Sequence, residues 1–444
     1  LKLGEGLPRQ SEVEQLYAQA NNDDLCNILY TSGTTGESKG VMLTYGQYEA
    51  ALKANDEVVP LKESDRVIQF LPITHIFERG WSYLAFSEGC HIIINTNPHD
   101  IQQSMRETHP TCMSSVPRFW EKVYQAVLDK IDRSSVAKQR LFRHALEVGR
   151  RYNIDCKSRC KRPSPLLAME YKLFDKMILR LVRKQIGLEN AHLFPTAGAT
   201  VSPAVERFVH SVGINMIVGY GLTESLATVS CDREDMQFTI GSVGRPINGL
   251  QVKIGDNDEI LLKGPTITPG YYKREAANQE AFTEDGFFRT GDAGYMKNGE
   301  LFLTDRIKDL FKTSNGKYIA PQMIESLLLV DKFIDQVIVI ANERKFVSAL
   351  IVPEFRLVEE WAKDHGIAFE SREDLCANAK VHKMMMDRIQ TLQQQLAHYE
   401  QIKRFTLIAH HFSMESGELT NTLKIRRPVI YKNFKEVVDK MYEE

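Results

Sequence analysis

The amino-acid sequence predicts an α/β protein in which a large N-terminal α/β domain is joined by a hinge to a small C-terminal α+β domain. Short apolar runs alternate with helical patterns in the first part of the chain, and glycine and proline recur between 240 and 303. A charged segment, TDRIKD, then interrupts the apolar pattern. The expected limits are 1–304 for the large domain, 305–308 for the hinge and 309–444 for the small domain.

Four strand candidates lie in the first 120 residues. They are Leu25–Tyr30, Arg66–Leu71, Cys90–Ile94 and Thr111–Ser115. Helical patterns separate them, and parallel strands need crossover connections of that kind. We therefore expect these strands to belong to a parallel sheet.

A basic helical insertion is predicted over about 118–190, with a break near 162–165. Apolar residues recur there at helical spacing, at Leu166, Met169, Leu173, Met177 and Leu181. Between Arg118 and Lys184 there are 18 Lys and Arg against 7 Asp and Glu, whereas the whole chain has a net charge of −2. Such a segment attracts anionic lipid, nucleic acid or a phosphorylated ligand, and a solvated helical face is the simpler alternative. Nucleic acid is disfavoured because the whole chain is slightly acidic and has no recognition motif.

The second half of the chain is predicted to mix strands and helices. Ser202-Pro203 is a typical helix start and Gly213 a typical stop, before a strand at Ile214–Val218. Short antiparallel strands are expected over 240–303. The small domain should contain a helix after Pro321, strands near 336–341 and 345–352, and helices through 355–402.

Composition narrows the class of protein. Of 444 residues, 43% are apolar and 26% charged, which is typical of a chain with a sizeable core. No run of 18 apolar residues and no signal-peptide pattern is present. The seven cysteines include no C-x-x-C pair, so free thiols in a reducing cytosol are expected. Because the chain begins with Leu, we expect it to be a fragment or processed product that lacks an upstream part.

The strongest local motif is YTSGTTGESKGV, from Tyr30 to Val41. Flexible backbone amides, hydroxyl donors and one cation are what a polyphosphate needs. The motif supplies them through Thr31, Ser32, Gly33, Thr34, Thr35, Gly36 and Lys39. It is not a Walker A loop, because only two residues separate Gly33 from Gly36 and Gly40 follows Lys39. A surface loop rich in Gly, Ser and Thr is the alternative.

This loop resembles the phosphate-binding loop of the adenylate-forming superfamily of acyl-CoA synthetases, luciferases and adenylation domains. Seven further blocks follow in that superfamily's order: LPITHIFER, FPTAGATVSP, GYGLTES, GSVGRP, FFRTGD, DRIKDLFKTSNGKYIAP and LTNTLKIRR. The segments TAGATVSP, VPRFWEKVY and NTLKIRR are most similar in sequence to those of long-chain fatty-acid–CoA ligases. The resemblance implies a superfamily member whose large domain lacks its first hundred or more residues.

The resemblance also implies a nucleotide site. Tyr220 and Gly221 would lie against adenine, beside a wall formed by Gly198 and Ala199. Asp292, reinforced by Arg306, would bind the ribose hydroxyls. Thr223 and Glu224 would be catalytic, and the Glu224 carboxylate would hold Mg²⁺ through a hard oxygen.

Lys424 matches the mobile catalytic lysine of the superfamily, although Leu423 stands where Gly usually precedes it. A lysine at the α-phosphate would stabilise charge that grows in the transition state. Lys308 matches the hinge residue. Gly316 would leave room for the pantetheine arm of CoA, and His75 and Trp120 would border the substrate tunnels. Packing roles are the alternative for His75 and Trp120.

The resemblance therefore implies that ATP, Mg²⁺ and CoA serve the conversion of a long-chain fatty acid, through acyl-AMP, to acyl-CoA, AMP and pyrophosphate. Two alternatives stay open: activation of another acid or transfer to a carrier-protein thiol, and a nucleotide- or lipid-binding fragment without turnover. We expect a cytoplasmic protein with peripheral contact at the inner face of the membrane through 118–190, and no nucleic-acid partner.

Overall fold

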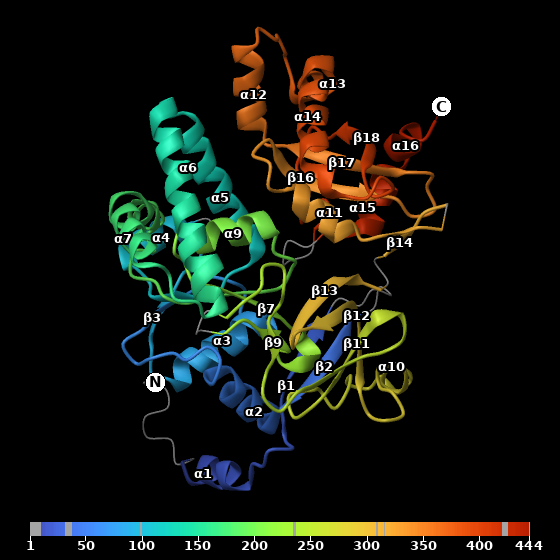
Figure 1. The fold of residues 1–444 in the computed structure, drawn as a ribbon. Coiled ribbons are helices and arrows are strands. Elements are labelled where there is room, and N and C mark those ends of the chain that lie inside the picture. The colour runs from blue at the N-terminus through green and yellow to red at the C-terminus, as the bar shows by residue number, and fades with distance from the viewer. Residues whose placement is uncertain are drawn as a thin grey trace.

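A computed structural model describes residues 10–31, 38–97, 100–233, 237–307, 310–314, 316–419 and 425–443. Figure 1 shows a large N-terminal α/β domain and a smaller C-terminal domain that mixes helices with a short sheet. This arrangement confirms the predicted fold class. Ser32, Gly33, Thr34, Thr35, Gly36, Lys308 and Lys424 lie outside the described residues, so their roles and the predicted hinge stay predictions.

The centre of the large domain is a parallel sheet. Its strands are β3 (Arg66–Gln69), β4 (His91–Ile94), β5 (Cys112–Met113), β6 (Phe194–Thr196) and β7 (Met216–Tyr220). Strand β3 pairs in parallel with β4 and β5, and bridges from Cys112 to Leu193 and from Ser115 to Thr196 extend the parallel run to β6 and then β7. These pairings confirm the parallel sheet predicted from three of the four strand candidates.

The first strand candidate has a different partner. Strand β1 (Leu25–Thr31) pairs with β2 (Lys39–Thr44) in antiparallel register, Thr31 opposite Lys39. The prediction that this segment is a strand is confirmed, but its expected place in the parallel sheet is wrong. A short connection returns the chain directly to a neighbouring antiparallel strand, whereas a parallel partner would need a crossover.

Helices cover the parallel sheet and extend from it. Helices α2 (Tyr45–Asp56), α3 (Ile76–Ser87) and α4 (Ile101–Thr108) precede residues 118–190, whereas α1 (Gln10–Gln19) is exposed and lies apart from the sheet (Figure 1). The predicted insertion contains α5 (Pro117–Asp132), α6 (Val136–Arg150), a π-helical turn (Arg151–Cys156), α7 (Pro165–Phe174), a second π-helical segment (Asp175–Leu179) and α8 (Arg180–Ile186). The helices predicted over about 118–190 and the break near 162–165 are thus present, whereas the interpretation of this segment as an insertion stays a prediction.

Helix α9 (Pro203–Ser211) begins and ends where the sequence predicts. Gly213 follows it with φ +86°, a left-handed conformation that glycine adopts without strain. Ser202 occupies the N-cap position, but its side chain makes no capping hydrogen bond.

Antiparallel strands complete the large domain. Strands β8 (Ser230–Cys231) and β9 (Arg245–Pro246) extend the sheet from β7. A separate four-stranded antiparallel sheet contains β10 (Gln251–Ile254), β11 (Glu259–Lys263), β12 (Phe288–Lys297) and β13 (Glu300–Arg306), with α10 (Glu275–Ala281) before β12. The expectation of short antiparallel strands in this region is confirmed.

The small domain is built on a three-stranded sheet. Strand β17 (Val347–Pro353) is buried throughout and lies between β16 (Ile334–Ile340) and β18 (Ile402–Leu407). The surrounding elements are β14 (Phe311–Lys312), β15 (Tyr318–Ile319), α11 (Pro321–Leu328), α12 (Phe355–Asp364), α13 (Arg372–Ala377), α14 (Ala379–Leu392), α15 (Arg427–Asn433) and α16 (Lys435–Lys440). Strand β18 and the last two helices were not predicted from the sequence.

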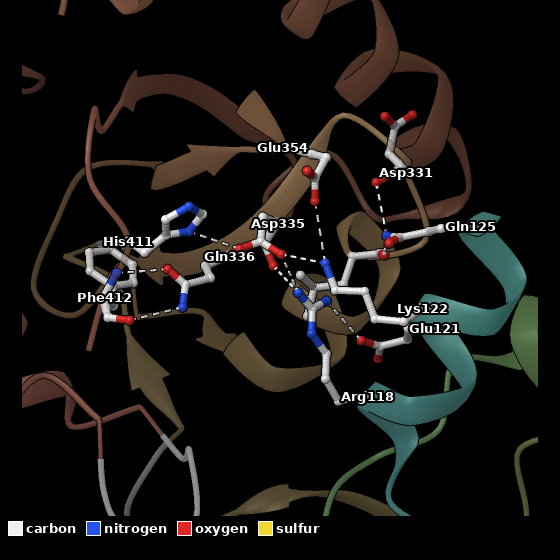
Figure 2. Close-up of polar contacts among 11 residues, drawn as sticks. Arg118, Glu121, Lys122, Gln125, Asp331, Asp335, Gln336, Glu354, His411 and Phe412 are labelled. Atoms are coloured by element: carbon white, nitrogen blue, oxygen red, sulfur yellow. Dashed lines mark hydrogen bonds and ion pairs between the residues drawn. The ribbon is translucent and has the colours of Figure 1, made fainter. Parts of the chain in front are cut away.

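Helix α5 joins the two domains through polar contacts. Figure 2 shows Asp335 of the small domain between Arg118 and Lys122 of α5 on one side and His411 on the other. Its Oδ1 atom lies 2.6 Å from both the Arg118 Nη2 and the Lys122 Nζ, and its Oδ2 lies 3.0 Å from the His411 Nδ1. Gln125 donates to the backbone carbonyls of Leu329 and Asp331. These contacts hold the small domain against α5 in the described arrangement.

Candidate active site

The β1–β2 hairpin flanks the predicted phosphate loop. Thr31 closes β1 and Lys39 opens β2, so the two ends of the loop lie opposite each other. A Cβ atom on Gly40 would lie 2.7 Å from the Ile28 side chain, which explains a glycine directly after Lys39. The hairpin therefore fixes the two described ends of the loop, Thr31 and Lys39.

Lys39 and Glu224 meet through a tyrosine that the sequence analysis did not identify. The Lys39 Nζ lies 4.9 Å from the centre of the Tyr271 ring, and the Tyr271 hydroxyl donates to the Glu224 Oε1 at 2.9 Å. The backbone of Thr268 donates to the Glu224 carbonyl at 2.7 Å. A cation, an aromatic ring and a carboxylate thus form one connected cluster at the described end of the predicted phosphate loop.

Burial raises the pKa of the Glu224 carboxyl above its ordinary value. The Tyr271 hydrogen bond and the charge of Arg306 act in the opposite direction, whereas the charge of Asp292 adds to the rise. Burial destabilises the charged form of a carboxyl group, and a bound cation stabilises that charged form. Glu224, in the turn that begins at Thr223, therefore has the chemistry of a Mg²⁺ ligand.

Tyr220, Asp292 and Arg306 form a second cluster close to the first. The Tyr220 hydroxyl donates to the Asp292 Oδ2 at 2.6 Å, and the Arg306 Nε lies 3.3 Å from the Asp292 Oδ1. Asp292 and Arg306 are directly paired across β12 and β13, and Tyr220 ends the parallel strand β7. Two residues from separate sequence blocks thus converge on the Asp292 carboxylate.

The predicted adenine wall lies on the loop after β6. Gly198 and Ala199 are exposed, and a Cβ on Gly198 would meet no atom within 4 Å. Gly221 is different, because a Cβ there would lie 1.3 Å from the backbone oxygen of Ala227. The glycine in GYG is thus required by the close approach of the next loop, while Gly198 borders open space of the kind that a planar base needs.

An apolar cavity begins beside Tyr220 and continues between the parallel sheet and two helices. Its wall includes Ala51, Leu52, Val59, Phe77, Trp81, Leu84, Ile217 and Leu226. Helices α2 and α3 supply most of these side chains, and β7 supplies Ile217 and Tyr220. The cavity therefore connects the polar cluster to the interior of the large domain.

His75 and Trp120 differ in their relation to this cavity. His75 is the N-cap of α3, and its Nδ1 accepts the backbone amide of Phe77, a residue of the cavity wall. Trp120 is fully buried and donates through Nε1 to Ser115 and Thr196. Thr196 is one of the residues that line the cavity, whereas Trp120 is not. A role in substrate tunnels stays a prediction for both.

Gly316 lies apart from these clusters, in the turn between β14 and β15. Its φ is +75°, its amide donates to the Thr313 carbonyl at 2.8 Å, and a Cβ there would meet no atom within 4 Å. Lys424 falls between Leu419 and Ile425, which pair as an isolated bridge. After this bridge, Arg427 forms a paired contact with Glu325 of α11, with N to O distances of 2.6 and 2.7 Å. The segment that carries Lys424 is thus anchored to the small domain on its C-terminal side.

Sequence reasoning missed Tyr271 because the block around it, ITPGYYK, has no charged or nucleophilic residue in a recognisable spacing. The available signal was Pro269-Gly270 before two tyrosines, a turn pattern that presents aromatic side chains. Gly270 has φ +141°, and its amide donates to the Thr268 hydroxyl at 3.1 Å. That turn directs Tyr271 toward Glu224.

Comparison with known proteins identifies the family. The family model described as AMP-binding enzyme matches residues 3–272, and the model of the AMP-binding enzyme C-terminal domain matches residues 308–444. The chain belongs to the AMP-binding enzyme family. This match places the chain in the adenylate-forming acyl-CoA ligase superfamily.

Curated relatives in the AMP-binding enzyme family carry the names of long-chain ligases. A long-chain-fatty-acid–CoA ligase from Mycobacterium bovis is 29% identical over 438 residues, which cover 97% of this chain and 72% of that protein. The peroxisomal long chain acyl-CoA synthetase 6 from Arabidopsis thaliana is 31% identical over 443 residues, which cover 95% of this chain and 61% of that protein. The chain thus spans between about three fifths and three quarters of these relatives' length.

Solved structures show the same fold. The adenylation domain of a carboxylate reductase from Mycobacterium chelonae has a TM-score of 0.72 at 23% identity, covering 96% of this chain and 61% of that one. The O-succinylbenzoate coenzyme A synthetase from Bacillus subtilis, solved with ATP and magnesium ion, has a TM-score of 0.60 at 20% identity, covering 92% and 70%. At these identities the likeness establishes the AMP-binding enzyme fold alone.

Proposed function

We propose that this protein activates a long-chain fatty acid with ATP and transfers the acyl group to CoA, giving acyl-CoA, AMP and pyrophosphate. The observation that carries the proposal is the similarity to long-chain ligases over nearly the whole chain, and the apolar lining of a small cavity beside Tyr220 agrees with it. The names of the curated relatives support the same acid and the same thiol.

Hydroxyl and amide side chains in the cavity wall are bonded to protein groups, which favours an alkyl chain as the occupant, although the buried indole N–H of Trp81 has no hydrogen-bond partner among the described residues. The Thr228 hydroxyl donates to the Asn55 Oδ1 at 2.8 Å, and the Asn55 amide donates to the Ala51 carbonyl at 2.7 Å. Thr196 is likewise bonded, to Ser115 and to Trp120. A small polar acid would find few free partners there, whereas an alkyl chain needs none.

The chemistry follows from the residues around the cavity mouth. In the first step a carboxylate oxygen of the acid attacks the α-phosphorus of ATP, and the bond to pyrophosphate breaks. Lys39 and the loop hydroxyls would bind the leaving phosphates, and Asp292 with Arg306 would orient the ribose. Mg²⁺ held by Glu224 would neutralise charge on the phosphate oxygens.

In the second step the thiol of CoA attacks the acyl carbonyl, its proton is lost, and AMP leaves. Adenylation makes this step possible because AMP is a far better leaving group than oxide. Gly316, which has open space around it, would leave room for the pantetheine arm.

The proposal includes peripheral contact with the inner face of the membrane through residues 118–190, in a protein that works in the cytoplasm. Among the described helices, none is long and apolar enough to cross a bilayer. The substrate itself favours membrane contact, since long-chain fatty acids partition into lipid.

Pyrophosphate release across a series of fatty acids of increasing chain length, with CoA or a carrier-protein thiol as acceptor, tests the proposal. We expect release to rise with chain length and thioester to form on CoA. A preference for short or aromatic acids, or for the carrier protein, would contradict the long-chain CoA ligase and favour another member of the superfamily. ATP binding without acid-dependent pyrophosphate release would favour a binding protein without turnover.

Lys424→Ala separates the two steps. We expect this variant to lose formation of acyl-AMP, because the charge growing at the α-phosphate is no longer stabilised, and to keep thioester formation from supplied acyl-AMP. Lys432→Ala, on α15 of the same domain, is the matched control and should leave both steps unchanged. Equal loss of both steps in Lys424→Ala would refute this division of labour.

A further inference from the structure

The outer face of the helix formed by α7, the π-helical segment and α8 exposes a row of large apolar side chains. Their exposed fractions are 69% for Leu166, 67% for Met169, 54% for Leu173, 52% for Met177 and 53% for Leu181. Single exposed apolar residues are common on soluble proteins, but a row of five at helical spacing is not. We call these five residues the apolar row.

The same helix is also apolar on its inner face. Leu167 and Leu179 are buried, Tyr171 stacks on Tyr152 with ring centres 4.0 Å apart, and Phe174 packs against His144. The core is therefore satisfied without the apolar row. A helix that is apolar on both faces and lies at the surface has one face left for another partner.

The π-helical segment Asp175–Leu179 keeps the apolar row on one face. On a regular α-helix each four-residue step overshoots one turn by about 40°. The last three steps of the row are all four residues, so its members would drift around the helix. The wider π-helical turn offsets this drift, and such turns often mark functional sites.

A row of basic residues runs beside the apolar row. Lys172, Lys176 and Arg180 directly precede Leu173, Met177 and Leu181, and Lys184 continues the series one turn later. None of these four forms an ion pair within the part of the chain that the structure describes. The two acidic residues of the helix are engaged elsewhere, Asp175 with Arg183 at 2.7 Å and Glu170 with His144 at 3.1 Å.

We infer that the apolar row and its basic neighbours form a docking surface for a bilayer that contains anionic lipid, with α7 and α8 lying in the plane of the membrane interface. The apolar row would enter the acyl boundary, and the four basic side chains would contact lipid phosphates. Figure 1 shows α7 at the outer edge of the large domain, where a flat surface can approach it. This inference narrows the proposed membrane contact to one surface and one lipid chemistry.

The charge pattern favours a bilayer over a protein partner. Residues 157–184 carry nine Lys and Arg against two Asp and Glu, whereas the chain as a whole is slightly acidic. A second copy of this chain would bring the same positive charge to the contact and be repelled. A surface of anionic lipid supplies negative charge and an apolar layer together.

Sedimentation with vesicles tests the inference without substrate or turnover, so its outcome is independent of the proposed ligase activity. Vesicles of phosphatidylcholine mixed equally with phosphatidylglycerol should bind the protein, and vesicles of phosphatidylcholine alone should bind it at least about tenfold more weakly. Salt should weaken binding to the mixed vesicles.

Two variants assign the binding to this surface. Leu173→Ser with Met177→Ser, and separately Lys172→Glu with Lys176→Glu, should each lower the vesicle partition coefficient about tenfold or more. All four side chains are exposed, so both double variants should keep the unfolding midpoint of the unmodified protein. Phe86→Ser on α3, where the side chain is 78% exposed, is the matched control and should bind as the unmodified protein does.

Unchanged binding in both double variants would overturn the inference, as would equal binding to both kinds of vesicle. A dimer that dissociates when Leu173 and Met177 are replaced would also overturn it, because a second copy would then cover the apolar row.

Discussion

At the scale of single residues, Tyr271 links the Glu224 carboxylate to Lys39. Its ring lies beneath Lys39 and its hydroxyl bonds Glu224, while burial raises the pKa of the tyrosine itself. The hydroxyl thus stays a donor at neutral pH. Tyr271 therefore acts as a positioning residue for Glu224.

Tyr271→Phe should lower kcat/KM for ATP roughly tenfold, since a hydrogen bond to a charged group contributes about 1.5–3 kcal/mol. The ring, and with it the Lys39 contact, is retained. A purely structural role would not change the Mg²⁺ concentration needed for half-maximal rate, which should rise in this variant. Tyr272→Phe is the control, because its ring contacts Lys273 on the surface. Parallel loss in both variants would contradict the role assigned to Tyr271.

Titration of the buried Glu206 carboxyl makes the free energy of unfolding depend on pH. The residue is 1% exposed, accepts the Gly241 amide at 2.9 Å, and burial raises its pKa to about 8. Because the unfolded chain loses this proton near pH 4.5, the unfolding free energy should fall as pH rises from about 4.5 to about 8. Below about pH 4.5 the contribution of Glu206 to the free energy of unfolding is fully present.

Glu206→Gln should remove this slope, since an amide does not ionise. We expect the variant to gain stability relative to the unmodified protein between pH 5 and pH 9, by on the order of a few kcal/mol. Urea unfolding at three pH values measures it, with the exposed Glu284→Gln as control. An unchanged pH slope in Glu206→Gln would show that Glu206 does not titrate in this range.

At the scale of elements, local sequence patterns predicted where helices and strands lie. They did not predict which distant strands pair with one another. The helix at Pro203 and the strands at Arg66, Cys90 and Thr111 follow from Pro and Gly residues at element boundaries and from apolar runs. The antiparallel partner of Leu25–Thr31 does not, because the strand's own residues carry no information about direction. The apolar row was recognised by its spacing, yet spacing alone could not tell that Leu173 and Met177 face outward.

The residues of the candidate site were also predicted only in part. Asp292, Arg306, Tyr220 and Glu224 were found through family motifs, and the structure brings them together. Tyr271 was missed, since a tyrosine after a turn has no signature until its partner is known. Strand β18 was missed because a helical pattern continued up to it.

Helix packing gives a test at this scale. A Cβ on Gly149 of α6 would lie 2.0 Å from the Ser211 carbonyl oxygen of α9, so the two helices must separate if it is added. Gly149→Ala should cost about 1–3 kcal/mol and lower the first thermal unfolding midpoint. On α3, a Cβ on Gly80 would meet its nearest atom at 3.7 Å. Gly80→Ala should be neutral or stabilising, because alanine is the better helix former. Equal midpoints for the two variants would contradict the close contact between α6 and α9.

At the scale of the whole molecule, one carboxylate dominates the junction between the domains. Burial alone would raise the pKa of Asp335, but the charges of Arg118 and Lys122 outweigh it and hold the pKa below its usual range. The carboxylate is therefore charged at neutral pH. High ionic strength and substitution are two ways to weaken the junction.

Asp335→Asn should shift the population away from the described domain arrangement. Removing one charge from a partly buried cluster leaves Arg118 and Lys122 without their shared partner, which costs about 1–2 kcal/mol and changes the ratio of arrangements roughly 5- to 30-fold. The distance distribution between fluorescent labels on α6 and α14 measures that ratio, and in the unmodified protein high salt should move it in the same direction. Asp439→Asn removes the same charge from a pair with Arg344 inside the small domain, so its distribution should stay unchanged. If Asp335→Asn and Asp439→Asn give the same distribution, the ion pairs on α5 do not determine how the two domains sit.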